Sequence, residues 1–176
     1  MTSDMMPDVL LEQLLYEEPA QTEEPVEDTM HGRYLSLLSD GKQFAIAFTH
    51  VVDIIEIQPI TRVPNCPDFV RGVTNLRGKV IPIMDLRIRF GRDFLPYTDR
   101  TCIVVLEERG SAVGLVVDKV SEVLTLTDEQ IAPPPSFIHG LDTRYVEGVG
   151  KSESGVVLIL NCAAVLDDEM LDFAQQ

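Results

Sequence analysis

The stretch that most resembles a chemical motif is Gly72–Lys79, which reads GVTNLRGK. A glycine-rich loop that ends in lysine is typical of phosphate-binding loops, in which backbone N–H groups and the lysine hold the phosphates. Here five residues separate the two glycines, one more than the motif allows, and Val80 stands where a magnesium-binding serine or threonine is required. Strand-like runs flank the loop, so no helix N-terminus points at a phosphate. We expect no nucleotide site here.

Other residues with reactive or ligating side chains also lack a productive spacing. Three histidines and three cysteines are scattered without the short intervals of metal sites: His31, His50, His139, Cys66, Cys102 and Cys162. Widely spaced cysteines in odd number indicate reduced thiols in a cytoplasmic protein. Asp53 and Asp85 could form a pair of catalytic carboxylates, but acids at strand ends more often meet solvent or cap turns. The sequence therefore predicts no enzyme, cofactor or metal.

Arg77 and its neighbours remain as a candidate recognition site. Asn75–Gly78 predicts a tight turn, in which Gly78 permits the sharp backbone and Leu76 and Arg77 project at or near the tip. Arginine offers a planar fork of donors for carboxylates or carbonyls and is favoured at the centres of interfaces. A lone exposed arginine is usually an ordinary surface residue, but an apolar neighbour and nearby basic residues favour recognition of a partner.

Charge excludes one class of partner. The net charge is −15, and residues 1–30 hold nine acidic residues with no lysine or arginine. Nucleic-acid binding needs the opposite balance, because neutralising phosphates supplies most of the affinity. The sign reverses locally between residues 62 and 92, where two acids, Asp68 and Asp85, face seven bases: Arg62, Arg71, Arg77, Lys79, Arg87, Arg89 and Arg92. These bases form either a solvated face or a docking patch for an acidic protein surface.

The first 30 residues are set apart as an acidic extension from a domain at 31–176. Leu10, Leu11, Leu14 and Leu15 have helical spacing, so residues 1–30 are expected to be partly disordered or to form one short amphipathic helix. The chain contains no apolar run of the ~20 residues that span a bilayer, and its N-terminus is acidic, unlike a signal peptide. We expect a cytoplasmic protein without direct membrane insertion.

From residue 33 onward the hydrophobic pattern repeats every second residue, which predicts strands. The expected strands are Tyr34–Leu38, Gln43–Phe48, Val51–Ile57, two within Phe69–Leu86, Thr101–Leu106, Ala112–Val117, Lys119–Leu126, Tyr145–Gly150 and Gly155–Asn161. A short turn or helix is expected at Arg87–Gly91, and an amphipathic helix at Cys162–Ala174. Thr127–Thr143 is expected to be a long loop.

The two halves of this pattern resemble each other, roughly over residues 33–91 and 101–166. Gly41–Ile57 overlays Gly110–Leu126, and Phe69–Asp85 overlays Tyr145–Asn161, apolar on apolar. Two copies of a unit of about five strands predict two small β-barrels packed together, and the sequence leaves open whether strands are exchanged between them. In the second copy Ser152 and Glu153 replace Leu76 and Arg77, so these two residues are what the first copy adds.

Part of the strand pattern falls within four segments: Phe69–Gly91, Asp53–Ile57, Val113–Pro135 and Tyr145–Leu160. These segments resemble the CheW family, the coupling proteins of bacterial chemotaxis. The resemblance implies an all-β fold of two SH3-like five-stranded β-barrel lobes with a C-terminal helix. It also implies a non-catalytic adaptor that binds the cytoplasmic tip of methyl-accepting chemoreceptors and the regulatory domain of a CheA-type histidine kinase.

The resemblance also implies which residues meet the partners. The receptor-binding groove would include Ile54, Glu56, Arg71, Gly72, Leu76, Arg77 and Val80. Phe137 would belong to a second kinase contact, for which the family often has a basic residue where this chain has Ala132. The chain has no room for the phosphotransfer and ATP-binding domains of the kinase, so it resembles a stand-alone coupler. Two alternatives stay open: a CheW-like scaffold in twitching motility or surface sensing, and an enzyme or small-ligand barrel.

Overall fold

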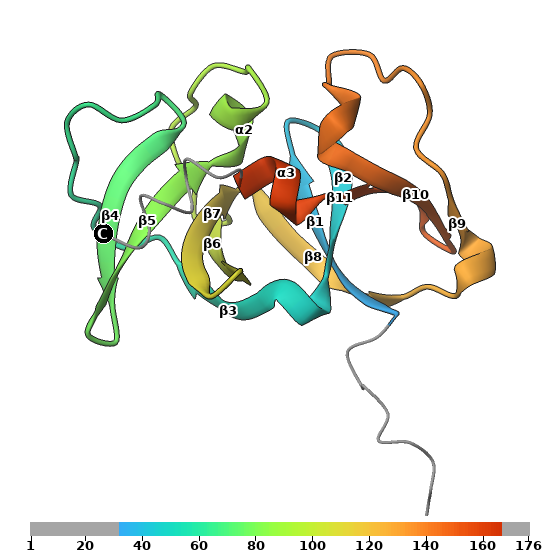
Figure 1. Ribbon diagram of the computed structural model, residues 1–176, viewed down its shortest axis with the longest axis horizontal. Helices are drawn as coiled ribbons and strands as arrows, with labels where there is room; N and C mark the ends of the chain where they lie inside the picture. The colour runs from blue at the N-terminus through green and yellow to red at the C-terminus, as the bar shows by residue number, and fades with distance from the viewer. Residues whose placement is uncertain (1–31, 167–176) are drawn as a thin grey trace, which may run out of the picture. The chain divides into compact units, whose positions relative to one another are not determined.

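β-Strands dominate the computed structural model, which describes residues 32–166 (Figure 1). The strands are β1 Arg33–Ser39, β2 Lys42–Ala47, β3 Val51–Glu56, β4 Val70–Leu76, β5 Lys79–Asp85, β6 Cys102–Glu108, β7 Ser111–Val117, β8 Lys119–Thr125, β9 Ile131–Ala132, β10 Val146–Ser152 and β11 Gly155–Leu160. Within residues 32–166 the short α-helices are α2 Leu86–Arg89 and α3 Cys162–Leu166. Single 3-10 turns span Phe48–His50, Asp128–Gln130 and Thr143–Tyr145. The all-β class and the short helix after β5 are confirmed.

The strands form two sheets, which we call lobe 1 and lobe 2. Lobe 1 has the six-strand order β8-β1-β2-β11-β10-β9, and lobe 2 has the five-strand order β3-β6-β7-β5-β4 (Figure 1). The expected fold of two β lobes is confirmed. Lobe 1 has six strands rather than five because β9, which falls in the expected long loop, pairs with Val149 and Gly150 of β10.

Strands are exchanged between the two halves of the sequence. Lobe 2 combines β3, β4 and β5 with β6 and β7, while β1 and β2 pair with strands that follow residue 118. The two orders correspond strand by strand when β1, β2, β3, β4 and β5 are matched with β6, β7, β8, β10 and β11. Even the parallel contacts correspond, because Ile83 pairs with Gly114 and Ile159 pairs with Ala45. Each lobe is thus built from both halves of the chain.

Each sheet is closed by a chain segment that follows one edge strand and pairs with the strand near the opposite edge. In lobe 2 the chain beyond β3 returns to β4, where Thr61 and Val73 exchange two backbone hydrogen bonds of 2.8 Å. In lobe 1 the chain beyond β8 returns as β9 to β10. Closing a sheet in this way leaves few unpaired edges, which is how small β-barrels avoid uncontrolled pairing.

In the described part of the chain, the alternation of side chains along the strands produces three apolar clusters. One lies inside lobe 1, around Leu124, Val157 and Ile159, and one lies inside lobe 2, around Ile83, Ile103 and Val105. The largest is shared by both lobes and contains Leu35, Leu37, Phe44 and Ile46 from lobe 1, Val104, Leu106, Val113 and Leu115 from lobe 2, and Cys162, Val165 and Leu166 from α3. β1, β2, β6 and β7 therefore have buried residues on both faces, and the sequences of β6 and β7 are nearly continuously apolar for this reason.

Some expectations fall outside the described residues. The amphipathic helix proposed within residues 1–30 is one of them. The C-terminal helix is described from Cys162 to Leu166, and its expected continuation to Ala174 is not among the described residues. No helix in the described range 32–166 has both the length and the apolar character needed to cross a membrane.

Candidate functional site

The candidate site is built on the turn between β4 and β5. Leu76 pairs with Lys79, so the turn itself is the two-residue segment Arg77-Gly78. Both residues have positive φ, 52° at Arg77 and 85° at Gly78, as a type I′ hairpin requires. Asn75 Oδ1 accepts a hydrogen bond of 3.1 Å from Gly78 N. A residue with a Cβ is held here in the left-handed conformation, and this fixes the direction in which Arg77 leaves the backbone.

The guanidinium of Arg77 reaches back to β3. Its Nη1 lies 2.6 Å from Oδ2 of Asp53, and the two groups form an ion pair. Their relative orientation is not that of a regular hydrogen bond. The other carboxylate oxygen of Asp53 accepts from Ile54 N at 2.9 Å. The Arg77 side chain is 73% exposed and that of Asp53 is 22% exposed. Arg77 is therefore anchored at one nitrogen, while the rest of its guanidinium stays open to solvent.

Exposed apolar side chains accompany this arginine. On β3, Val52, Ile54 and Glu56 point outward in alternation, and Val52 and Ile54 are 56% and 41% exposed. On β5, Val80 is 61% exposed. The contact between Arg77 and Asp53 joins the hairpin tip to β3, at the residue that lies between Val52 and Ile54 in the chain. We call Val52, Ile54, Val80 and Arg77 the lobe 2 surface.

Two residues expected at the site have architectural roles instead. Leu76 does not project from the tip but is half-buried against the cluster inside lobe 2. Gly72 is buried with φ of 139°, and a Cβ placed there would lie 2.1 Å from the carbonyl oxygen of Thr61. Only glycine lets the chain after β3 approach β4 closely enough to close lobe 2.

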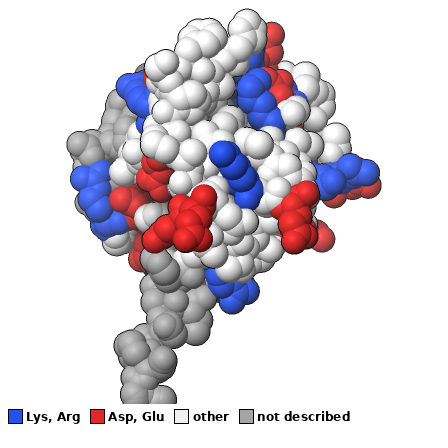
Figure 2. Space-filling view, turned by 90° about the vertical axis from the view of Figure 1, so that its right-hand side faces the viewer, with Lys and Arg blue, Asp and Glu red and all other residues white. Residues whose placement is uncertain are grey.

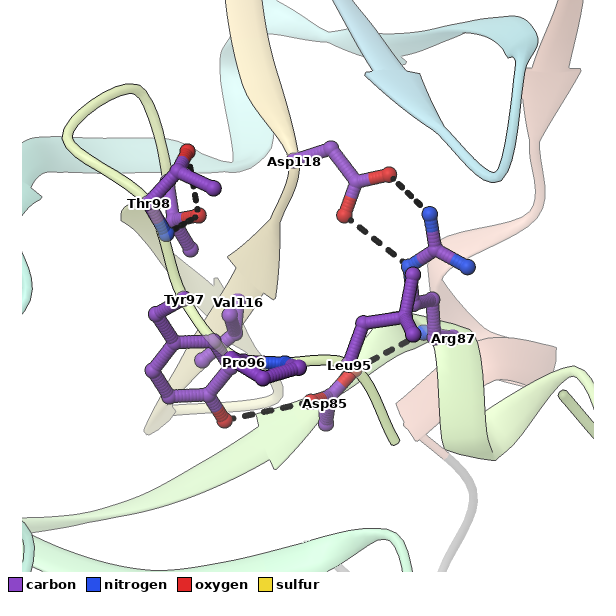
Figure 3. Close-up of a pocket in the computed structure, with 9 residues that line it drawn as sticks. Asp85, Arg87, Leu95, Pro96, Tyr97, Thr98, Val116 and Asp118 are labelled. Carbon is purple, nitrogen blue, oxygen red and sulfur yellow. Dashed lines mark hydrogen bonds and ion pairs between the residues drawn. The ribbon is translucent and has the colours of Figure 1, made fainter. Parts of the chain in front are cut away.

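Arg71 supports the neighbouring loop rather than the hairpin tip. Its guanidinium stacks on Phe94 at 4.8 Å from the ring centroid. Nearby, Tyr97 Oη donates to Oδ2 of Asp85 at 3.1 Å, and Arg87 N donates to Oδ1 of Asp85 at 3.0 Å, which caps α2 (Figure 3). Burial raises the pKa of Asp85, although these hydrogen bonds and Arg71 oppose the rise. Burial, followed by the charge of Asp85, also raises the pKa of Tyr97.

The basic run between residues 62 and 92 does not form one patch, because several of its members are used inside the protein. Arg87 binds both oxygens of Asp118, at 3.2 and 2.8 Å, and Oδ1 of Asp40 at 3.1 Å (Figure 3). Arg89 donates to the carbonyl oxygens of Val165 and Ala164, while Arg92 pairs with Asp40. Of the two alternatives for these bases, a solvated face or a docking patch, one patch made of all seven is therefore not formed, because Arg87, Arg89 and Arg92 bind groups of the protein itself.

Phe137, the expected kinase contact, lies away from this region in the chain segment between β9 and β10. It is 73% exposed, the largest value among the bulky apolar residues of the described chain. Ala132 is part of β9 and pairs with Val149. Figure 2 faces the β9–β10 side of lobe 1 and shows mostly uncharged surface, interrupted by separate acidic and basic side chains.

The groups considered for catalysis are engaged elsewhere. Asp53 pairs with Arg77 and Asp85 caps α2, so they do not form a carboxylate pair. A pocket of about 190 Å³ beside Asp85 is lined by Arg87, Tyr97 and Asp118, but these polar groups bind one another (Figure 3). No three side chains of metal-ligating type gather among residues 32–166.

Comparisons with known proteins agree with this architecture. The family model described as CheW-like domain matches residues 33–170. The chain belongs to the CheW family. It is 37% identical to the chemotaxis protein CheW of Klebsiella aerogenes over 142 residues, covering 81% of this chain and 86% of that protein. It is 34% identical to the CheW of Bacillus subtilis over 137 residues, covering 78% and 88% respectively.

A solved structure extends the similarity to three dimensions. The scaffolding protein TtCheW from Thermoanaerobacter tengcongensis matches with a TM-score of 0.73 and 29% identity, covering 79% of this chain and 94% of that chain. The CheW family, to which the chain belongs, is one of scaffold proteins rather than enzymes. Its function then depends on the surfaces it presents to other proteins.

Proposed function

We propose that this protein is a cytoplasmic adaptor that couples chemoreceptors to a CheA-type histidine kinase. The lobe 2 surface receives the cytoplasmic tip of the receptor. The observation that carries the proposal is the arrangement of exposed Ile54 and Val80 beside the anchored but open guanidinium of Arg77. Apolar residues next to an arginine are the composition typical of interface centres.

Apolar and charged residues of this surface contribute to recognition in different ways. Burial of the exposed apolar side chains against a receptor helix contributes ~25 cal/mol per Å² of apolar surface. The donors of Arg77 that do not face Asp53 can bind a carboxylate or a helix-terminal carbonyl of the receptor. Glu56, exposed on the same side of β3, adds a charge that selects against acidic residues nearby.

The kinase contact is proposed on the other lobe, at the exposed ring of Phe137. The two lobes share the largest apolar cluster of the described domain, so a receptor on lobe 2 and a kinase on lobe 1 are held in a fixed relation. An adaptor with two separate surfaces makes the state of the kinase depend on the state of the receptor. In an array, many such modest contacts act together through multivalency.

Replacement of Arg77 by alanine tests the proposal. The fold is expected to remain intact, while receptor-tip affinity falls about tenfold or more, as for a central interface arginine. Kinase activation in reconstituted arrays should fall with it. The matched control is Arg109→Ala, because Arg109 occupies the same position of the type I′ turn between β6 and β7, with φ of 52°.

The Arg109→Ala control accounts for the cost of placing alanine in a left-handed backbone conformation. Both substitutions place alanine in the same left-handed position, so any change in turn stability should be similar in the two variants. Normal coupling by Arg77→Ala, or an equal loss of coupling in both variants, would show that the lobe 2 surface is not the receptor site.

A further inference from the structure

Lobe 1 carries an unassigned counterpart of the lobe 2 surface. Strands β8 and β11 occupy in lobe 1 the places that β3 and β5 occupy in lobe 2. Val123 on β8 is 43% exposed and Val156 on β11 is 60% exposed, close to the 41% of Ile54 and the 61% of Val80. Isolated exposed valines are common on protein surfaces. The repeated fold accounts for the similar exposure at equivalent positions, but it does not require an apolar residue there, and both lobes have one at both positions.

The link between hairpin tip and first strand is also repeated. In lobe 1, Ser154 at the tip of the β10–β11 hairpin donates a hydrogen bond of 3.3 Å to Oε2 of Glu122 on β8. Glu122 stands at the position equivalent to Asp53, which holds the other tip through Arg77. Val123 follows Glu122, and Val156 lies two residues beyond Ser154. The contact therefore places the hairpin tip beside β8, at the residue that precedes Val123 in the chain.

The two surfaces differ in charge. The lobe 2 tip reads Arg77-Gly78-Lys79, whereas the lobe 1 tip reads Glu153-Ser154-Gly155. Glu122 and Glu153 are both exposed, and Lys151 is the basic residue nearest in sequence to this tip. The apolar pair is thus kept while the charge at the tip changes from basic to acidic. A ligand suited to one surface is disfavoured by the other.

We propose that Val123, Val156, Glu122 and Glu153 form a second docking surface, the lobe 1 surface, for an amphipathic helix whose apolar stripe is flanked by lysine or arginine. The charge complementarity of Glu122 and Glu153 selects the basic flanks. The expectation of a helix rests on the proposed function, in which the equivalent lobe 2 surface receives a receptor helix. An adaptor with both surfaces distinguishes two helical partners by charge alone.

Two synthetic helical peptides with the same leucine stripe test the proposal, one flanked by lysine and arginine and one flanked by glutamate. Each is titrated into the full chain carrying labelled methyl groups. The basic peptide is expected to shift the Val123 and Val156 signals, and the acidic peptide to bind there at least tenfold more weakly. Val123→Ser and Glu153→Lys should each lower the affinity for the basic peptide about tenfold. Both residues are exposed, so their replacement leaves the core intact.

Arg77→Ala separates this proposal from the receptor assignment. It changes only the lobe 2 surface, so binding of the basic peptide should be unchanged even if the receptor proves to bind elsewhere. The proposal is overturned if the basic peptide leaves both valine signals in place, or if both peptides bind equally. It is also overturned if the chain without peptide self-associates through this surface and Val123→Ser abolishes that association, which would assign the surface to a second copy.

Discussion

Arg77 occupies a backbone conformation that costs a residue with a Cβ about 1 kcal/mol or more. The type I′ turn requires that conformation, and the Asn75 side chain and the ion pair with Asp53 help to offset its cost. A glycine here would form the turn more easily but would carry no guanidinium. Asp40 and Arg109 have the same positive φ in two other hairpins. Positive φ is therefore a property of the turn type, and what distinguishes the candidate site is the arginine and its surroundings.

Asp85 provides a residue-scale prediction about pH. Burial raises its pKa, so the folded protein binds the proton more tightly than the unfolded chain does. The contribution of Asp85 to the free energy of unfolding therefore decreases as the pH rises from the unfolded pKa, near 3.8, through the higher folded pKa. Asp85→Asn has no proton to lose and can still cap α2. Its stability relative to the parent protein should rise across this window and then level off.

Urea denaturation of both proteins from about pH 3 to about pH 7 measures this difference. A difference that is constant with pH, or that favours the parent protein increasingly as the pH rises, would contradict the assigned burial of the carboxylate.

At the scale of secondary-structure elements, closure of lobe 2 depends on Gly72. A Cβ at this position would collide with the Thr61 carbonyl oxygen at 2.1 Å, where the chain after β3 pairs with β4. Gly72→Ala is therefore expected to destabilise the fold by about 3 kcal/mol or more, through backbone strain and loss of the two hydrogen bonds. Gly78→Ala is the control, because it also has positive φ but nothing lies within 4 Å of the added Cβ.

Thermal and urea unfolding of the two variants check this expectation. The Gly78 variant should lose only about 1 kcal/mol, the cost of the left-handed conformation. Equal effects in both variants would mean that the close approach of Thr61 does not hold the lobe together.

The strands were predictable from sequence because alternation is a local signal. Val51–Ile57 and Ala112–Val117, for example, match β3 and β7 within a residue or two. β9 was missed because its two residues show no period and are defined only by pairing with β10. At the site, the exposure of Ile54, Val80 and Arg77 agrees with the expectation, but Leu76 turned inward. The contact of Arg77 with Asp53 joins residues 24 positions apart, and a local pattern does not encode it.

At the scale of the whole molecule, strand exchange makes the two halves of the chain interdependent. In lobe 1, β1 pairs with β8 and β2 pairs with β11, so strands of the first half of the sequence pair with strands of the second half. The largest apolar cluster also contains residues of both halves. A fragment ending near residue 98 would therefore lack four strand pairings: β1 with β8, β2 with β11, β3 with β6 and β5 with β7. We expect such a fragment, and the complementary one, to be largely unfolded when separate.

Backbone NMR spectra of the separate and mixed fragments test this prediction. Poor signal dispersion in each fragment alone and recovery on mixing are expected. A half that gives a dispersed spectrum by itself would show that a lobe can be assembled from one half of the sequence.

The central claim is that the lobe 2 surface is the receptor site, and methyl NMR tests it most directly. A receptor-tip fragment is titrated into the full chain with labelled valine and isoleucine methyl groups. The account predicts shifts at Val52, Ile54 and Val80 that require about tenfold more receptor fragment or more in Arg77→Ala, while Val123 and Val156 stay unchanged as similarly exposed internal references. Shifts confined to Val123 and Val156, or no shift at Ile54 and Val80 when the receptor fragment is bound, would contradict it.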